Sequence, residues 1–227
     1  LNPDTEIVDD ALWRMVEFLE RNPKAGICGA HLTYGDGSFQ HGAFQFPSLA
    51  QVMLDLFPLP ALRGMHRVHD SGINGRFPVS RWQGQEPFEV DFVLGAALMA
   101  RGEAVREIGG LDDEYFMYCE EMDWCLRMAD AGWFVFAVPS ARVIHYAGQS
   151  SQQVRWPAFE RLWRSRLRFF GKHTSRYSEV DIMLIRFAIH TSMRLRSASA
   201  RRRFAAGEIS GVQLGEELNA NSAVSKM

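Results

Sequence analysis

The sequence predicts an α/β domain with a mostly parallel mixed sheet flanked by helices, followed by a C-terminal helical extension. Segments with apolar residues at helical spacing alternate with short runs rich in β-branched and aromatic residues. Hydrophobic residues make up 47% of the 227 residues, which is enough for a full core. From residue 156 onward the pattern becomes helical and basic. Strands that alternate with helices are typical of a sheet whose faces are covered by helices.

The first third of the chain predicts a helix, a buried strand and a long loop. Residues 9–22 carry apolar side chains at helical spacing, and Pro23 ends this helix. Residues 25–34 form an apolar run that predicts a buried strand. The sequence "GDGS" that follows is a turn signal. Residues 47–87 are rich in proline, glycine and aromatic residues without a sustained period, which predicts a long loop with one short helix.

The middle of the chain predicts two more strand regions around two helices. The sequence "FEVDFVLGAALMAR" predicts a strand that is apolar on both faces from Phe92 to Met99, as a central strand would be. A short helix over "GEAVREIGG" ends at its glycines, and an acidic helix follows. The sequence "GWFVFAVPSARVIHYAG" then predicts two short strands split by Pro139-Ser140.

The C-terminal third is basic and helical. Residues 155–203 hold 13 Lys and Arg against three Asp and Glu, and aromatic residues alternate with the first arginines. This pattern is typical of an amphipathic helix on an anionic membrane surface, or of a helix packed on the domain with its arginines in solvent. No RNA-binding motif accompanies the charge, so no nucleic-acid partner is predicted. The predicted organisation is a domain over 1–154, a basic helical extension over 155–205 and a flexible tail over 206–227.

Composition argues against several classes of protein. The three cysteines are too few for a disulfide framework, and no C-x-x-C pair suggests a structural zinc site. The first residues lack the pattern of a signal peptide. No run of about 18 uncharged apolar residues occurs, so no transmembrane helix is predicted. A reducing compartment, the cytoplasm, is the expected location.

The sequence "FMYCEEMDWCLRMADAG" contains the candidate chemistry. It places Glu120, Glu121 and Asp123 in the first turn of a helix, with Arg127 four residues after Asp123. An i, i+4 pair of this polarity stabilises an ordinary amphipathic helix. The helix dipole also favours ionised carboxylates in a first turn, and an ionised carboxylate can serve as a general base. The residues alone leave both interpretations open.

Four stretches together resemble inverting family 2 glycosyltransferases of the GT-A fold, in the bacterial branch that includes rhamnosyltransferase-like enzymes. The acidic stretch "GGLDDEYFMYCEEMDWCLRMADAGW" resembles the acid-rich motif of this family. The other three stretches, in the family's order, are "LNPDT", "VLGAALMARGEAVREIGGLD" and "ARVIHYAGQSS". The resemblance covers roughly residues 1–175 and implies an incomplete GT-A domain, since family members carry on the order of a hundred residues upstream.

The resemblance implies a nucleotide-sugar donor, a UDP- or dTDP-sugar, whose diphosphate binds a divalent cation. Asp4 and His145 occupy the positions that would meet this metal. Oxygen and imidazole ligands suit Mg²⁺ or Mn²⁺. Asn2 stands where the family's metal motif often has a first aspartate. Gly95 and Ala96 would line the donor-sugar or acceptor pocket.

The resemblance also implies a general base for the acceptor hydroxyl. Glu121 occupies the position of the usual aspartate base, and one extra methylene moves its carboxylate by about 1 Å. Asp123 is the alternative base. Glu120 would flank the base, and Arg127 would orient the carboxylates.

The implied acceptor is a saccharide or a lipid-linked sugar on the inner face of the cell membrane. A membrane-bound acceptor agrees with peripheral contact through the basic extension. Missing first strands would leave sheet edges unpaired, which predicts self-association into a homo-oligomer. The alternative function is a non-catalytic, truncated relative that binds a membrane surface or a partner.

Overall fold

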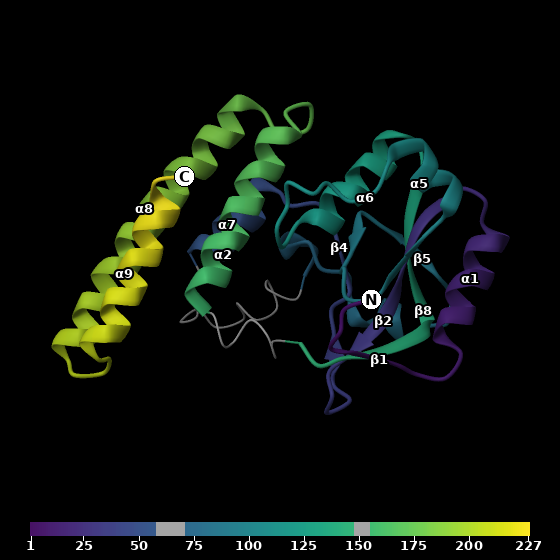
Figure 1. The fold of residues 1–227 in the computed structure, drawn as a ribbon, viewed down its shortest axis with the longest axis horizontal. Helices are drawn as coiled ribbons and strands as arrows, with labels where there is room; N and C mark the ends of the chain where they lie inside the picture. The colour runs from purple at the N-terminus through teal and green to yellow at the C-terminus, as the bar shows by residue number, and fades with distance from the viewer. Residues whose placement is uncertain (58–70, 148–154) are drawn as a thin grey trace. The chain divides into compact units, whose positions relative to one another are not determined.

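The structure is a computed structural model that describes residues 1–57, 71–147 and 155–227 (Figure 1). The chain divides into two compact units. Unit 1 comprises Leu1–Ser48, Pro60–Glu114 and Glu120–Gln149. Unit 2 comprises Leu49–Leu59, Tyr115–Cys119 and Ser150–Met227.

Unit 1 is built on a mixed sheet with two long strands at its centre. These are β2 (Ala25–Thr33) and β8 (Phe134–His145), which pair in parallel. Short strands pair in antiparallel orientation with the outer edges of β2 and β8. On β8 these are β1 (Thr5–Ile7) and β5 (Phe88–Val90), and on β2 they are β3 (Phe39–Gln40) and β7 (Leu98–Ala100). A separate two-stranded sheet joins β4 (Ala43–Phe44) and β6 (Phe92–Val93).

The α/β class and the mixed sheet are confirmed, but the sheet is not mostly parallel. Among the described strands, only β2 and β8 pair in parallel. A parallel pair needs a long crossover connection, whereas short strands can join an edge in antiparallel orientation. The apolar run expected as one central strand is likewise divided among β5, β6 and β7. Apolar character on both faces therefore reflects packing here, not a central position in the sheet.

Strand β8 joins the two runs that Pro139-Ser140 was expected to separate. Ala30 of β2 pairs with Val138, and the next residue, His31, pairs with Arg142. Residues 139–141 are therefore extra on β8 and form a bulge. A bulge keeps a strand continuous where proline cannot donate a ladder hydrogen bond.

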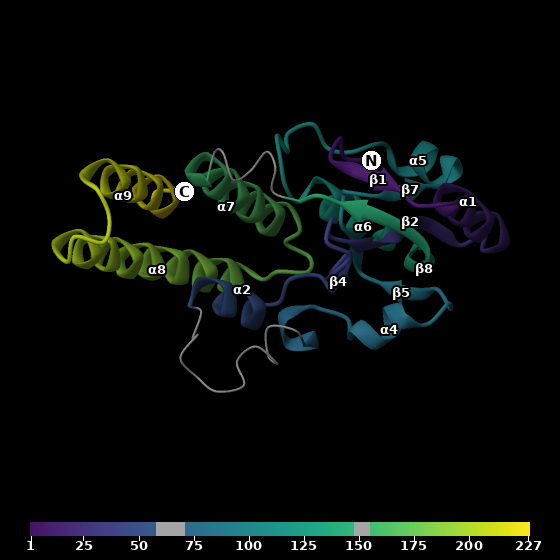
Figure 2. The same ribbon diagram turned by 90° about the horizontal axis from the view of Figure 1, so that it is seen from below.

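Helices of unit 1 cover the sheet and position its loops. Helix α1 (Ala11–Arg21) matches the prediction for residues 9–22 and buries Ala11, Met15, Phe18 and Leu19 in a core with β2 and β8. The remaining helices are η1 (Gly72–Asn74), α4 (Val79–Gln83), α5 (Gly102–Ile108) and α6 (Glu120–Asp130). Helix α5 ends at Gly109, whose φ of 81° is readily adopted by glycine. Figure 2 shows β1, β2 and β8 next to one another in this unit.

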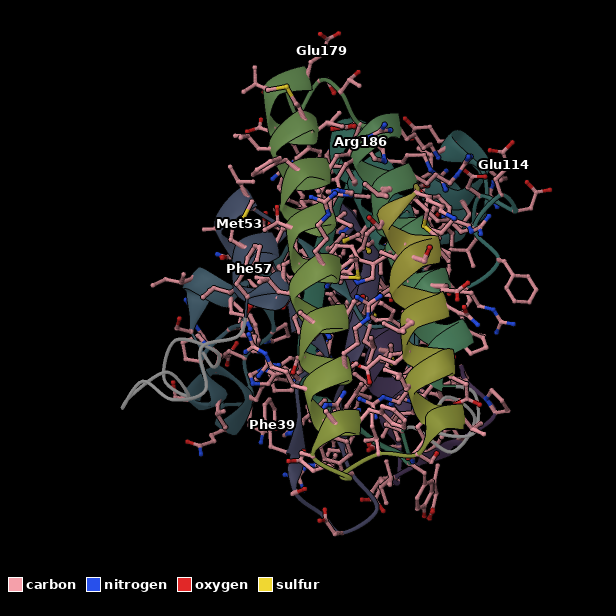
Figure 3. The ribbon with its side chains drawn as sticks, turned by 90° about the vertical axis from the view of Figure 1, so that its left-hand side faces the viewer. Phe39, Met53, Phe57, Glu114, Glu179 and Arg186 are labelled. Carbon is pink, nitrogen blue, oxygen red and sulfur yellow. The ribbon has the colours of Figure 1, made fainter. Side chains whose placement is uncertain are left out.

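Unit 2 consists of helices in its described part. They are α2 (Leu49–Leu56), α7 (Arg155–Lys172), α8 (Glu179–Ala205) and α9 (Gly211–Ser225). Ser178 and Ser210 begin α8 and α9 with complete capping boxes. Helices α8 and α9 lie side by side (Figure 3), and Arg203 of α8 forms an ion pair of 2.5 Å with Glu217 of α9.

One expectation for the C-terminal third differs from the structure. Residues 206–227 were expected to be a flexible tail, but most of them form α9, which buries Ala220 and Val224. Burial of small and branched side chains against neighbouring helices stabilises this weakly amphipathic segment. Helix α7 buries Trp163, Phe169 and Phe170, so this part of its apolar face is packed inside the protein. Among the described residues, no helix is long and apolar enough to span a bilayer.

Candidate functional site

Pairing of β1 with β8 brings the N-terminal "NPD" sequence to the late histidine. Thr5 lies opposite His145 in the antiparallel register, and the Tyr146 N–H donates to the Asp4 carbonyl at 2.9 Å. This register places the Asp4 carboxylate next to the His145 ring, with 3.5 Å between Asp4 Oδ1 and His145 Nε2. Two of the predicted metal-binding residues, separated by 141 positions in sequence, are therefore neighbours in space.

The His145 ring is oriented by a residue that the sequence does not indicate. His145 Nδ1 lies 3.2 Å from the side-chain carbonyl Oε1 of Gln40 on β3. That oxygen can only accept, so Nδ1 carries the proton and donates to it. In the neutral ring Nε2 then keeps a lone pair on the side of Asp4. A second hydrogen bond of this kind is the usual way in which a metal-binding histidine is fixed.

The Gly95-Ala96 stretch connects this pair to the acidic helix. The Asn2 N–H donates to the Ala96 carbonyl at 2.9 Å, which holds the "NPD" sequence against the loop before β7. On its other side, the α-carbon of Gly95 faces the Glu121 side chain: a Cβ at position 95 would lie 3.7 Å from three Glu121 carbons. The backbone of Gly95 and Ala96 thus lies next to Glu121 on one side and to the "NPD" sequence on the other.

Glu121 has the electrostatic character of a general base. Its Oε2 is buried and has no hydrogen-bond partner among the described residues. Burial raises the pKa of Glu121 to about 7, and the charge of neighbouring Glu120 adds to the rise, while the Gly95 N–H opposes it. Burial also raises the pKa of Glu120, whose Oε2 likewise has no partner in the described structure. A base with a pKa near 7 is half ionised at neutral pH and accepts a proton efficiently there.

The backbone is strained immediately before α6. Tyr118 and Cys119 have φ values of 70° and 66°, in the left-handed region that non-glycine residues rarely adopt. Each such residue costs about 1–3 kcal/mol, and this strain is typical of functional sites. Both strained residues lie immediately before Glu120, at which α6 begins.

Asp123 and Arg127 have different surroundings from Glu121. Asp123 is 0% exposed, and its Oδ2 accepts from Arg127 Nε at 2.8 Å. Arg127 also donates to the carbonyls of Ile108 at 3.0 Å and Gly110 at 2.7 Å. The pair therefore connects α6 to the chain that leaves α5. This geometry suits a positioning role, because the Asp123 carboxylate is turned into the fold.

The raised pKa of Glu121 predicts a pH-dependent stability difference between the wild-type protein and Glu121→Gln. Below pH 4.5 the carboxyl is protonated in both the folded and the unfolded chain, so its contribution is fully present. As the pH rises through about 7, ionisation favours the unfolded chain and the wild type loses stability. We expect Glu121→Gln to be more stable than the wild type at pH 8 by up to about 3 kcal/mol, and by little at pH 4.5. Urea unfolding at both pH values measures this difference, and a pH-independent difference would contradict it.

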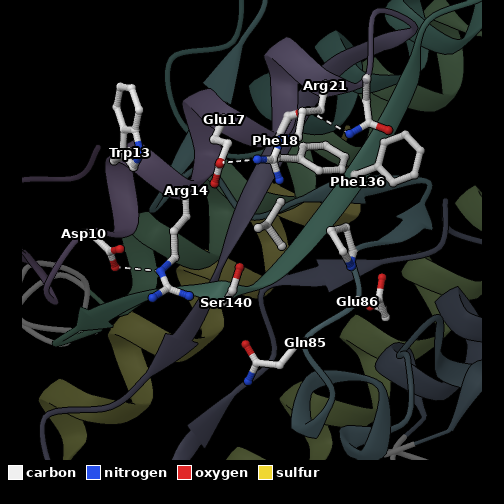
Figure 4. Close-up of a pocket in the computed structure, with 13 residues that line it drawn as sticks. Asp10, Trp13, Arg14, Glu17, Phe18, Arg21, Gln85, Glu86, Phe136 and Ser140 are labelled. Atoms are coloured by element: carbon white, nitrogen blue, oxygen red, sulfur yellow. Dashed lines mark hydrogen bonds and ion pairs between the residues drawn. The ribbon is translucent and has the colours of Figure 1, made fainter.

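A separate hollow of about 640 Å³ lies between α1 and β8 (Figure 4). None of the predicted site residues lines it. Its arginines are neutralised by carboxylates four residues earlier: Arg14 pairs with Asp10, just before α1, and Arg21 pairs with Glu17, each at 2.6 Å. This hollow therefore offers no excess charge to a nucleotide.

No protein-family model matches the chain, but curated relatives do. The chain is similar in sequence to bacterial rhamnosyltransferases, in agreement with the resemblance that its motifs show. One relative is the N-acetylglucosaminyl-diphospho-decaprenol L-rhamnosyltransferase of Mycobacterium tuberculosis, 32% identical over 158 residues. Others are rhamnosyltransferase WbbL of Escherichia coli, 34% identical over 83 residues, and dTDP-rhamnosyl transferase RfbF of Shigella flexneri, 28% identical over 72 residues.

These matches cover part of each protein. The mycobacterial match includes 66% of this chain and 47% of the relative, so the chain spans about half of that relative's length. The matches to the Escherichia coli and Shigella proteins include 37% and 32% of this chain, and 31% and 24% of the relatives.

Proposed function

We propose that the chain carries the base and metal side of an inverting rhamnosyltransferase that uses dTDP-rhamnose. The observation that carries this proposal is the Glu121 carboxyl: a buried oxygen without a partner among the described residues, in a group whose pKa is raised to about 7. An acceptor hydroxyl would satisfy this oxygen and give up its proton to it. The names of the relatives support rhamnose and dTDP.

Glu121, rather than Asp123, is the proposed base. Inversion needs a base on the acceptor hydroxyl, opposite the departing diphosphate. Glu121 adjoins Gly95, where a Cβ would lie 3.7 Å from the Glu121 side chain. The Asp123 carboxylate is buried and bound to Arg127. We therefore assign Asp123 and Arg127 to holding α6 in place, and Glu120 to raising the pKa of Glu121 through its charge.

Asp4 and His145 are the proposed protein ligands of a divalent cation. The described residues contain no group of three or more His, Cys, Asp or Glu side chains arranged to hold a metal. A carboxylate and an imidazole with Nε2 available fit a site where diphosphate oxygens complete the coordination, and the imidazole favours Mn²⁺ over Mg²⁺. When bound, the cation would neutralise the charge of the departing diphosphate.

The proposed acceptor is a lipid-linked sugar diphosphate. The mycobacterial relative is named for N-acetylglucosaminyl-diphospho-decaprenol. Gly95 and Ala96 lie between the proposed base and the proposed metal ligands, so the donor sugar and the acceptor hydroxyl would meet beside them. Such an acceptor places the reaction at a membrane surface.

Calorimetric titration with dTDP, with and without Mn²⁺, tests the donor side. We expect binding that depends on Mn²⁺, and at least about tenfold weaker binding in Asp4→Asn, because a metal ligand is lost. Asp130→Asn is the matched control, since Asp130 is an exposed carboxylate at the far end of α6. Equal binding with and without Mn²⁺, or equal loss in both variants, would contradict the assignment of Asp4.

A further inference from the structure

A basic groove of about 610 Å³ lies between α8 and α9 in unit 2. Figure 3 shows these two helices side by side, joined by a short turn at one end. Three cationic side chains line the groove: Arg194 and Arg201 from α8, and Lys226 after the end of α9. No carboxylate side chain is among the residues that line it. The groove therefore concentrates positive charge.

The three cations lack a neutralising partner among the described residues. In the described part of the chain, none of their side chains forms an ion pair. Arg203, one turn from the groove on the same helix, is by contrast paired with Glu217 at 2.5 Å. The α1 hollow in Figure 4 also has its arginines paired with carboxylates. Unpaired cations facing one cavity repel each other, and an anion in the cavity would remove this repulsion.

Uncharged hydrogen-bonding groups complete the lining. Asn221 is only 1% exposed, and its Nδ2 donates to Ser197 Oγ at 3.2 Å. The hydroxyls of Ser197 and Ser222 also line the groove. Guanidinium and ammonium groups beside hydroxyls are the donors that bind phosphate oxygens.

We propose that the α8/α9 groove binds a phosphate-bearing anion. The same chemistry is offered by the headgroup of an anionic phospholipid and by a soluble diphosphate. An exposed apolar stripe on the first half of α8 favours testing the lipid source. It is formed by Val180, Met183, Leu184 and Phe187, which are 59%, 61%, 39% and 70% exposed. Apolar and cationic surfaces on one helix suit a bilayer interface. This inference does not depend on the proposed catalytic function.

The first measurement is calorimetric titration of the whole chain with pyrophosphate, at low salt and in EDTA. EDTA removes divalent cations, so binding at the proposed Asp4 and His145 site does not contribute. Flotation with phosphatidylglycerol vesicles, compared with phosphatidylcholine vesicles, tests the lipid source. Pyrophosphate added to the flotation shows whether both ligands compete for one site.

The groove variant is Arg194→Gln/Arg201→Gln/Lys226→Gln. Its matched control, Arg164→Gln/Arg186→Gln/Arg202→Gln, makes the same change in net charge with exposed residues that do not line the groove. We expect the groove variant to bind pyrophosphate, or phosphatidylglycerol vesicles, on the order of 100-fold more weakly than the wild type. The control variant should stay within a few-fold of the wild type at the soluble ligand.

Each outcome decides the proposal. Selective loss in the groove variant supports it. Pyrophosphate binding alone identifies a soluble phosphate ligand, and vesicle binding that pyrophosphate reverses identifies a lipid headgroup. Binding of neither ligand by the wild type overturns the proposal, and so does equal loss in both variants, which would indicate bulk charge only. In EDTA, Asp4→Asn should not change these measurements. A negative result for the groove is therefore distinct from a negative result for the proposed transferase function.

Discussion

Glu121→Gln is expected to lower the rate of sugar transfer by about 10²- to 10⁴-fold, the usual contribution of general-base catalysis. Glutamine keeps the size of the side chain and its contact with Gly95 but cannot accept the proton. The assay measures rhamnose transfer from the proposed donor, dTDP-rhamnose, to the proposed lipid-linked acceptor; the acceptor for which the mycobacterial relative is named serves as the probe. Because the pKa of Glu121 is raised to about 7, the wild-type rate should rise with pH through neutrality.

The control for this prediction is Asp123→Asn, which alters a carboxylate two residues away. If Asp123 positions α6, Asp123→Asn should reduce both activity and stability, and the residual activity should keep the same rise with pH. If Asp123 were the base, its variant would abolish transfer and Glu121→Gln would retain it. Unchanged transfer in Glu121→Gln would rule out the assignment of Glu121.

For the acidic helix, the sequence predicts some features of the structure but not others. Its position and its polar first turn were predictable, since three carboxylates and an i, i+4 arginine mark a helix start. An i, i+4 pair of Asp and Arg is typical of an ordinary amphipathic helix, but the structure buries Asp123 completely. The helical pattern alone contains no information on distant partners, such as the Ile108 and Gly110 carbonyls that accept hydrogen bonds from Arg127.

The two predicted metal-binding residues could be found from sequence motifs, but the residue that orients His145 could not. Asp4 and His145 were indicated by two recognisable stretches of sequence, and the β1–β8 register brings them together. Gln40 carries no such signal: it lies 105 residues from His145 in sequence, on a strand of two residues. Contacts of this kind depend on which strands pair and in which register. The alternation of apolar and polar residues along one strand does not show which distant strand it pairs with.

Arg127→Met is expected to lower the free energy of unfolding by about 3 kcal/mol at pH 7. The substitution removes the cationic partner of the fully buried Asp123, and breaking a buried pair from one side costs about 3–5 kcal/mol. We take the lower end because the Arg127 side chain is 22% exposed and water can partly solvate the site. The hydrogen bonds from Arg127 to the Ile108 and Gly110 carbonyls are also lost. Urea unfolding at neutral pH measures the change.

A double-mutant cycle separates the ion pair from these carbonyl contacts. Asp123→Asn/Arg127→Met removes the buried charge together with its partner, so it should be more stable than Arg127→Met alone. The stability that the second substitution restores measures the penalty of the uncompensated carboxylate. The loss of stability that remains, relative to the wild type, includes the effect of the lost hydrogen bonds from Arg127 to the Ile108 and Gly110 carbonyls. Asp123→Asn alone lowers the free energy of unfolding of the wild type by some amount. If it lowered that of Arg127→Met by the same amount, the two residues would be independent. The pair would then have no role in holding α6, and Asp123 would again be a candidate for the base.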